Sequence, residues 1–468
     1  MFNPTSARLL VKSITSKTPR RMRLFDIRLI ETAICRSLGQ HFDPLFCFLL
    51  AVCLLSMQSA GSAPADSVVA VNRAQSTEKA PQQDPGQTPN RSPRQLPDQL
   101  PDQSPNQLHA HPSEQQLYQS LGQLLFFDPS LSKTGNQSCS SCHEPSKGFV
   151  DTRISAAQGA VSLGDDNQSF GSRNTPGITY AALTPAFRKD SEGYLGGFFL
   201  DGRALTLEDQ AIDPFINPIE MALPDHAALV EKLLQNAIYR PILKQLLGDS
   251  FAQHGSRILD VTKRSLAAFQ RGAVFSSFDS KYDRYLAGEE TLTAKEERGR
   301  SLFFSQLVNC SNCHLLNPAN VDAGETFTNY RYHNIGIPAN KQAIELAADR
   351  SSFPDLGLYQ HPDVTEETEK GKFKVPSLRN VAVTAPYMHN GVFKKLETAV
   401  HYYNQFIVNN RSTRTNPETG QAWAAPEVNE NLSRELLRQG QPMDQQRLDA
   451  IVAFLKTLTD KRYEALLQ

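Results

Sequence analysis

Outside two short motifs, this 468-residue chain has little cysteine. Three of its seven cysteines lie before residue 60, and the other four stand in Cys139-Ser140-Ser141-Cys142-His143 and Cys310-Ser311-Asn312-Cys313-His314. If the segment before residue 60 is removed, no cysteine is left for a disulfide or a free thiol. The shortage therefore excludes a fold held by disulfides.

Basic clusters and strand-like patterns are also scarce, and this narrows the possible partners and the fold class. No dense cluster of Lys and Arg occurs outside the N-terminal region, so nothing indicates a nucleic-acid partner. Alternating apolar and polar residues, the pattern of a half-buried strand, are also scarce. The sequence therefore predicts an all-α protein.

The N-terminal region resembles an export signal. Basic residues precede a strongly apolar run over residues 45–55, and small residues follow it. The run is short for a membrane-spanning helix, which needs roughly 20 residues. We interpret residues 1–65 as a signal that is either cleaved or kept as a membrane anchor, the alternative being a buried core helix. This places the protein in the periplasm, with the anchor as its only membrane contact.

Residues 66–112 have the composition of a disordered linker. Pro, Gln, Asp, Ser and Asn dominate residues 82–107, and such a segment cannot bury enough apolar surface to offset chain entropy. Ordered protein is expected from Ser113. Apolar residues at helical spacing predict the following helices: 114–127, 207–212, 226–247, 258–269, 296–304, 396–406 and 444–458.

The two CxxCH motifs are typical of c-type haem attachment. Two thiols form thioethers with the haem vinyl groups, and the adjacent histidine binds the iron. A zinc site built from two CxxC pairs is the structural alternative, but it does not explain the repeated histidine. Thiol redox chemistry is less favoured, because no thioredoxin-like βαβ pattern surrounds either pair. We therefore predict Cys139, Cys142, Cys310 and Cys313 as attachment residues, with His143 and His314 as iron ligands.

A helix precedes each motif, and the two units lie about 170 residues apart. This repeat predicts two cytochrome c-like haem domains packed around an inter-haem interface. We place the N-terminal haem domain at residues 113–285 and the C-terminal haem domain at residues 286–468.

The second axial position of each iron decides its chemistry, because an open iron can bind peroxide and a closed one mainly passes electrons. After His143 the next methionine is Met221 and the next histidine is His226, so the first iron has no obvious second ligand nearby. The second iron has several candidates: His333, Met388, His389, His401, Tyr402 and Tyr403.

Several short segments resemble one known family. They are Leu121-Gly122-Gln123-Leu124-Leu125-Phe126-Phe127-Asp128, Arg173-Asn174-Thr175-Pro176, Asp201-Gly202-Arg203-Ala204, Asn217-Pro218-Ile219-Glu220-Met221, Val375-Pro376-Ser377-Leu378-Arg379-Asn380-Val381 and Ala385-Pro386-Tyr387-Met388-His389-Asn390-Gly391. In this order, from about residue 115 to 460, they are similar to segments of the bacterial di-haem cytochrome c peroxidase and MauG family. The resemblance implies a peroxide-reactive N-terminal haem and a six-coordinate C-terminal haem.

The resemblance also implies roles for individual residues. Glu220 matches the acid–base glutamate of the family, and Gln210 and Pro214 match residues of the same pocket. Classical peroxidases carry a distal histidine near the position of Gly159, which this chain lacks, as do MauG-type members. In those members a tyrosine binds the second iron, and the matching residue is Tyr403, with Met388 as the fallback.

Two more features follow from the family match. Asn174, Thr384 and Pro386 match a calcium site between the haems, the alternative being a plain turn at Arg173–Pro176. The residue before Asp201-Gly202-Arg203 is usually a tryptophan that carries electrons or holes, whereas here it is Leu200. Either electrons tunnel directly between the haems, another aromatic side chain substitutes, or the haems share charge weakly.

The sequence thus predicts a periplasmic di-haem oxidoreductase that uses hydrogen peroxide to oxidise a donor. The donor is a small electron-donor protein or a protein substrate, the second case being MauG-like. The missing distal histidine and Tyr403 favour the MauG-like reaction, whereas Leu200 argues against it. The alternative is a non-catalytic periplasmic di-haem electron carrier, which has no need of Glu220 and Gln210.

Overall fold

The computed structural model describes residues 112–467, except 154, 316–323, 409 and 411. The predicted signal or anchor over 1–65 and nearly all of the predicted linker over 66–112 lie outside the described residues. Within the described part, no helix combines the length and the apolar character needed to cross a membrane.

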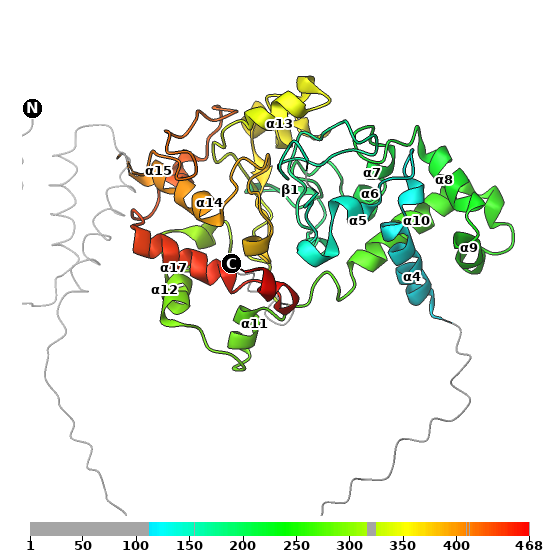
Figure 1. The fold of residues 1–468 in the computed structure, drawn as a ribbon, viewed down its shortest axis with the longest axis horizontal. Helices are drawn as coiled ribbons and strands as arrows, with labels where there is room; N and C mark the ends of the chain where they lie inside the picture. The colour runs from blue at the N-terminus through cyan, green and yellow to red at the C-terminus, as the bar shows by residue number, and fades with distance from the viewer. Residues whose placement is uncertain (1–111, 154, 316–323, 409, 411, 468) are drawn as a thin grey trace, which may run out of the picture. The chain divides into compact units, whose positions relative to one another are not determined.

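The described chain is largely helical, as predicted (Figure 1). The helices are α4 Glu114–Phe127, α5 Cys139–Cys142, α6 Leu207–Gln210, α7 Asp213–Ile216, α8 His226–Gln235, α9 Tyr239–Leu247, α10 Gly255–Gln270, α11 Lys281–Leu286, α12 Ala294–Phe303, α13 Lys341–Leu346, α14 Leu396–Tyr402, α15 Asn404–Ile407, α16 Arg434–Leu437 and α17 Gln445–Lys456. Short 3-10 turns join them, among them η2 Pro129–Leu131, η4 Ala181–Leu183, η6 Cys310–Asn312, η11 Val381–Val383 and η12 Lys461–Leu466.

Strands are few and short in the described residues. β1 Arg188–Asp190 pairs antiparallel with β2 Gly193–Leu195, and β3 Tyr332–His333 pairs antiparallel with β4 Phe373–Lys374. Tyr332 stands opposite Lys374 in the second pair. Each sheet has two strands, so the strands only fasten loops to one another.

Two of the predicted helices are interrupted in the structure, and a third ends early. The helix expected over 226–247 breaks at Asn236, whose backbone is extended and whose side-chain oxygen accepts the Ile238 N–H at 2.9 Å. That local hydrogen bond competes with helix continuation. The helix expected over 207–212 ends at Gln210, and the one expected over 396–406 is interrupted at Tyr403, between α14 and α15.

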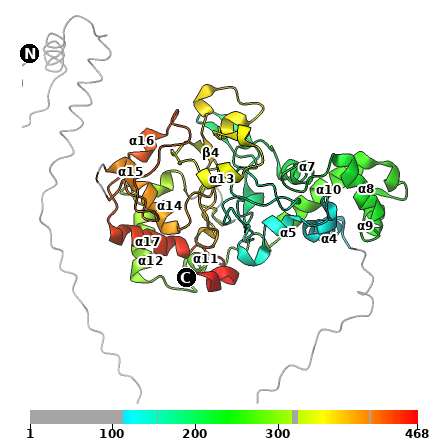
Figure 2. The ribbon, with the colours of Figure 1, turned by 45° about the horizontal axis from the view of Figure 1, so that its top comes forward.

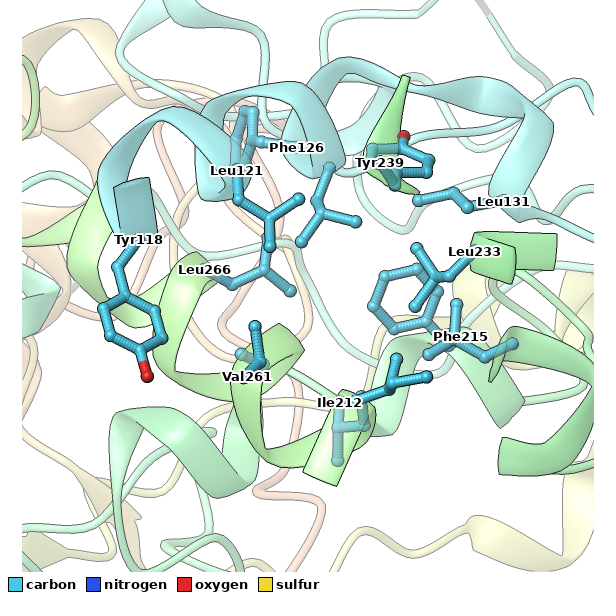
Figure 3. Close-up of a cluster of buried hydrophobic side chains, with 14 of the residues drawn as sticks. Tyr118, Leu121, Phe126, Leu131, Ile212, Phe215, Leu233, Tyr239, Val261 and Leu266 are labelled. Atoms are coloured by element: carbon cyan, nitrogen blue, oxygen red, sulfur yellow. The ribbon is translucent and has the colours of Figure 1, made fainter. Parts of the chain in front are cut away.

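Helix α4 crosses α10 at a glycine. A Cβ atom on Gly122 would lie 1.9 Å from the Ser265 carbonyl oxygen, so only glycine permits this approach. Around the crossing a core forms from residues between Tyr118 and Phe275, including Leu125, Phe126, Phe215 and Leu266. Figure 3 shows part of this core, with side chains of α4 and α10 facing those of α7, α8 and α9.

A second core is built in the same way around α12 and α17. A Cβ atom on Gly299 would lie 1.9 Å from the Ala450 carbonyl oxygen, so these helices also cross at a glycine. Phe303, Phe327, Tyr402 and Phe454 are among the buried residues of this core. Both views show α12 beside α17 and α4 beside α10 (Figures 1 and 2). The repeat inferred from the sequence therefore extends to helix packing.

Buried polar contacts join residues before 286 to residues after 286. The Tyr180 hydroxyl donates to the Asp460 carboxylate, and the Asn380 amide donates to the other Asp460 oxygen at 2.9 Å. Arg173 binds Asp201 and Asp355, with its Nε 2.7 Å from Asp355. Removing one partner of a buried ion pair leaves an uncompensated charge, which is strongly destabilising. The Arg173–Asp355 pair therefore holds together two segments that lie far apart in the sequence.

Candidate functional site

The first CxxCH motif forms a short helix that presents its histidine in a defined orientation. Cys139 and Cys142 begin and end α5, and the backbone N–H of His143 donates to the Cys139 carbonyl at 2.9 Å. The His143 Nδ1 lies 3.0 Å from the Phe149 carbonyl oxygen. This contact makes Nδ1 the protonated nitrogen and leaves Nε2 for a metal.

The second motif repeats this arrangement. Cys310 begins the 3-10 turn η6, and the His314 N–H donates to the Cys310 carbonyl at 3.0 Å. The His314 Nδ1 lies 2.9 Å from the Phe327 carbonyl oxygen. Burial lowers the pKa of His143 and lowers that of His314 to about 4, so both imidazoles are neutral, as metal ligation requires.

The four thiols are placed in two separate pairs, one in each motif. Burial raises the pKa of Cys139, Cys142 and Cys310 to about 12 and that of Cys313 to about 11, so all four are neutral thiols. In the described part of the chain, no three His, Cys, Asp or Glu side chains are placed to hold a metal ion. The two CxxC pairs thus do not share a zinc site, and the donor set fits two covalent haems.

The structure brings Glu220, Gln210 and Pro214 together with the first motif. All three line a cavity of about 60 Å³ that His143 and Cys142 also line. Gln210 is the last residue of α6, Pro214 lies in α7, and Glu220 follows α7. The three residues therefore reach the cavity from consecutive short segments.

Glu220 is held in place by two hydrogen bonds. The Asn217 amide donates to its Oε1 at 2.7 Å, and the Asp165 N–H donates to its carbonyl at 2.9 Å. Burial raises the pKa of Glu220, and Arg203 opposes that rise. A carboxyl group at a cavity can both take and give a proton, which is the chemistry of a general acid–base.

Met221 lies in the same cavity, with 2 % of its surface exposed, and belongs to the first core. It was the nearest methionine after His143 in the sequence. A thioether beside the first histidine is relevant to the alternative function, because a second axial ligand closes an iron.

The second motif opens into a larger cavity of about 370 Å³, which is lined mainly by residues of the second core and its surroundings, together with Asn174, Pro176, Gly177, Thr179 and Leu200. Tyr403 and Met388, the predicted ligand and its fallback, both line it, together with His314. Burial raises the pKa of Tyr403, and nearby Cys313 and Cys310 add to the rise. In the described residues, no hydrogen-bond acceptor meets the Tyr403 hydroxyl, which leaves its oxygen available for a metal.

The neighbouring tyrosine differs in this respect. Tyr402 is buried in the second core, and its hydroxyl donates to the Gly336 carbonyl. Tyr402 is absent from the described lining of the cavity. The interruption between α14 and α15 at Tyr403 separates the two tyrosines, one into the core and one toward the cavity.

The histidines proposed as second ligands are placed differently from one another. The His401 Nε2 meets the Ser412 carbonyl at 3.2 Å, and His401 is not among the residues described as lining the cavity. His333 and His389 do line it. His389 stacks on Phe373 with ring centroids 3.8 Å apart, and its Nε2 lies 3.8 Å from the Glu427 carboxylate without a hydrogen bond.

The predicted calcium residues also gather at the larger cavity. Asn174, Thr384 and Pro386 all line it. The Asn174 amide nitrogen donates to the Gly159 and Ala160 carbonyls at 3.2 and 3.1 Å, which leaves its side-chain oxygen free. An amide oxygen and two backbone carbonyls are ligands that calcium accepts.

Leu200 lines the same cavity, and the Lys374 backbone N–H donates to its carbonyl at 3.0 Å. No aromatic side chain from residues 113–285 is among those described as lining this cavity. Trp423 packs on Phe393 and Tyr402 in the second core and donates to the Thr413 carbonyl at 2.8 Å. The aromatic residues described as lining this cavity, among them Phe373 and Tyr387, all come from residues 286–468.

Several contacts at the sites have no signal in the sequence. The carbonyls of Phe149 and Phe327 orient the two histidines from backbones with φ of 58° and 55°, which phenylalanine rarely adopts. An Nη atom of Arg153 lies 3.2 Å from the Cys142 sulfur. One repeated feature is visible in the sequence. A glycine, Gly122 or Gly299, and a pair of phenylalanines precede each motif, and aligning the two halves of the chain reveals them.

Comparison with known proteins finds a matching family model and several similar chains. The family model described as "Di-haem cytochrome c peroxidase" matches residues 117–291. The chain is 48 % identical to the methylamine utilization protein MauG of Paracoccus denitrificans over 360 residues, 77 % of this chain and 92 % of that protein. It is 31 % identical to the cytochrome c551 peroxidase of Nitrosomonas europaea, over 62 % of this chain and 73 % of that protein.

Among solved structures, the diheme peroxidase BthA of Burkholderia thailandensis is similar in fold. The TM-score is 0.64 at 31 % identity, over 75 % of this chain and 88 % of that chain.

Proposed function

Because the chain belongs to the di-haem cytochrome c peroxidase and MauG family of oxidoreductase enzymes, we propose that it reduces hydrogen peroxide at the first motif with electrons drawn through the second. The overall balance is one peroxide, two electrons and two protons giving two waters. Two c-type haems, which the family implies, supply the redox chemistry when bound. The observation that carries the proposal is Glu220 in the cavity of His143.

The protein's own groups perform proton transfer and positioning at the first site. Glu220 takes a proton from one peroxide oxygen and returns it to the other, which a carboxyl group of raised pKa can do. The Asn217 amide holds the carboxylate in place at 2.7 Å. Gln210 and Pro214 shape the cavity, with the Gln210 amide as a hydrogen-bond partner for peroxide.

At the second site the residues serve electron transfer. His314 and Tyr403 would hold the iron of the second haem, with Met388 as the alternative to Tyr403. An anionic phenolate oxygen favours the more oxidised iron, so Tyr403 suits a site that stores oxidising equivalents. Asn174, Thr384 and Pro386 would hold one calcium ion.

The finer arrangement is part of the same proposal. Residues 113–285 and 286–468 would be two haem domains packed around an inter-haem interface, which the two separate cores support. The protein would be periplasmic, with a small donor protein or a protein substrate as its partner. Leu200 favours direct tunnelling between the haems and donor oxidation over a MauG-like reaction.

The second candidate is a di-haem electron carrier, and Met221 is the observation in its favour. If its sulfur binds the first iron, that iron is closed to peroxide. Met221→Leu would then convert the first haem from low spin to high spin. A first haem that is high spin before the substitution contradicts the carrier.

Electron paramagnetic resonance of the ferric protein tests the proposal. We expect one high-spin and one low-spin haem, and a rapid absorbance change on adding hydrogen peroxide without prior reduction. Two low-spin haems with slow reaction toward peroxide would overturn the peroxidase proposal.

A further inference from the structure

The wall of the larger cavity changes character from one chain segment to another. Helices α14 and α17 contribute apolar side chains, among them Leu396, Ala399, Ile451 and Leu455. Strands β3 and β4 and the loops contribute polar ones, namely His333, Asn334, Asp355, Lys374, His389 and Glu427. A haem has an apolar macrocycle and a charged edge, so it fits a cavity that is lined by apolar side chains on some segments and by polar side chains on others.

Lys374 is the unusual member of the polar set. Its Nζ donates to the Gly197 carbonyl oxygen, and it lies 5.7 Å from the centre of the Phe198 ring. No carboxylate oxygen in the described part of the chain lies within 4.0 Å of its ammonium group. Burial lowers the pKa of Lys374 to about 7, and Asp201 acts in the opposite direction.

The other cations near this cavity already have carboxylate partners. Arg379, which also lines it, binds both carboxylate oxygens of Asp283. Arg173 binds Asp201 and Asp355. Of the Lys and Arg side chains described as lining the cavity, Lys374 alone is without an acidic partner.

We propose that the Lys374 ammonium group pairs with a propionate carboxylate of the haem attached at Cys310 and Cys313. The inference rests on the proposed attachment of that haem. An ammonium group has three donors, and the Gly197 carbonyl uses one, so two remain for an incoming carboxylate. A buried cation and a buried carboxylate each cost free energy alone, and pairing offsets much of that cost.

The pair would act on the haem in two ways. It would fix the direction in which the propionate edge points, toward β4 and the Gly197–Leu200 segment. It would also place a positive charge beside the haem edge, which favours the reduced iron and raises its reduction potential. Lys374 is therefore a positioning and tuning residue, because it touches the cofactor edge rather than peroxide.

The decisive measurement is the midpoint potential of each haem in Lys374→Met, by spectroelectrochemistry. Lys370→Met is the matched control, because Lys370 pairs with Glu367 and is not described as lining the cavity. We expect the potential of the second haem to fall in Lys374→Met, to stay unchanged in Lys370→Met, and to be largely restored in Lys374→Arg. An unchanged potential in Lys374→Met, or an equal shift at both haems, overturns the inference.

Haem attachment is measured separately, by the mass of the peptide that contains Cys310 and Cys313. Loss of haem in the wild-type protein would contradict the proposed function, whereas retained haem with an unchanged potential contradicts only the role of Lys374. If Lys374→Met does not mature, a crystal structure of the wild-type holoprotein decides. We expect Nζ within about 3.2 Å of a propionate oxygen, and a propionate paired to other side chains instead overturns the inference.

Discussion

The two CxxCH regions are alike up to their histidines and differ beyond them. In each, a helix crosses a longer one at a glycine, Gly122 or Gly299, and ends in paired phenylalanines before the motif. In each, a phenylalanine carbonyl fixes the histidine ring, at 3.0 Å from His143 and 2.9 Å from His314. The repeat therefore preserves what attaches and orients a haem.

The side chains that line the two cavities together with the histidines differ. The first cavity, about 60 Å³, presents a carboxyl group, Glu220, from a turn between short helices. The second, about 370 Å³, presents a phenol, Tyr403, from an interrupted helix. The two regions thus share the contacts that orient each histidine and differ in the residues that line the two cavities.

The largest expected effect separates the first region from the second. Glu220→Gln keeps the size of the side chain but removes proton transfer, so we expect the rate of reaction with hydrogen peroxide to fall about 10²–10⁴-fold. Stopped-flow absorbance measures that rate. The control is Glu231→Gln, an exposed residue of α8 bonded only to Gln235, which should leave the rate unchanged. Equal rates in both variants would remove Glu220 from the mechanism.

The next effect is confined to the second region and compares two adjacent tyrosines. Tyr403→Phe should alter the low-spin haem spectrum, because the oxygen that would bind iron is lost. Tyr402→Phe should leave that spectrum unchanged and lower the free energy of unfolding by about 1–3 kcal/mol, because the Gly336 carbonyl loses its donor. A spectrum unaffected by Tyr403→Phe transfers the ligand role to Met388 or a histidine.

The similarity of the two regions can be tested at the helix crossings. Gly122→Ala and Gly299→Ala each place a methyl group against a backbone carbonyl, so each should lower the free energy of unfolding by about 1–3 kcal/mol. Denaturant unfolding followed by circular dichroism measures the change. Gly255→Ala, where the added methyl group meets only Val230 at 3.7 Å, should not destabilise the protein. Different costs at the two crossings would mean that the regions are not built alike.

The next expected effect is smaller and concerns the proposed calcium site, whose residues come from both regions. Asn174→Ala removes the only side-chain ligand of the proposed calcium set, so calcium affinity by titration calorimetry should fall. The exposed Asn136, whose amide bonds Thr134, provides the control variant Asn136→Ala. If Asn174→Ala binds calcium as tightly as Asn136→Ala, the site is only a turn.

The smallest effect is on stability and concerns Glu220 again. Burial raises its pKa, so the folded state disfavours the ionised carboxylate and wild-type stability falls as pH rises above the ordinary carboxyl pKa of about 4.3. Glu220→Gln should therefore melt above the wild type at pH 7, and the difference should vanish below that pKa. A melting difference that is independent of pH would contradict the cause given for the raised pKa.

Much of the fold could be predicted where local signals are strong. The helix over 114–127 appears with the expected bounds, because Ser113 forms a capping box at its start and Asp128-Pro129 stops it. The expected helix over 226–247 was wrong at Asn236, because one side-chain hydrogen bond outweighs a weak apolar period. The domain bounds stay a prediction.

The candidate sites divide in the same way. Glu220, Gln210 and Pro214 were named from motifs and share one cavity with His143. The choice between Tyr403 and Met388 stays open by position alone, since both line the larger cavity. The orienting carbonyls, Arg153 and Lys374 could not be predicted, because their roles depend on which distant backbone or side chain each one meets.

The sequence by itself determined the covalent chemistry. Two CxxCH motifs specify where haems attach, and their place in the chain specifies that the attachment is repeated. Only the tertiary structure decided which groups face each histidine, because Glu220 and Tyr403 reach their cavities from segments about 80–90 residues along the chain. Contacts over such separations arise from packing of the two cores, and no local spacing in the sequence encodes them.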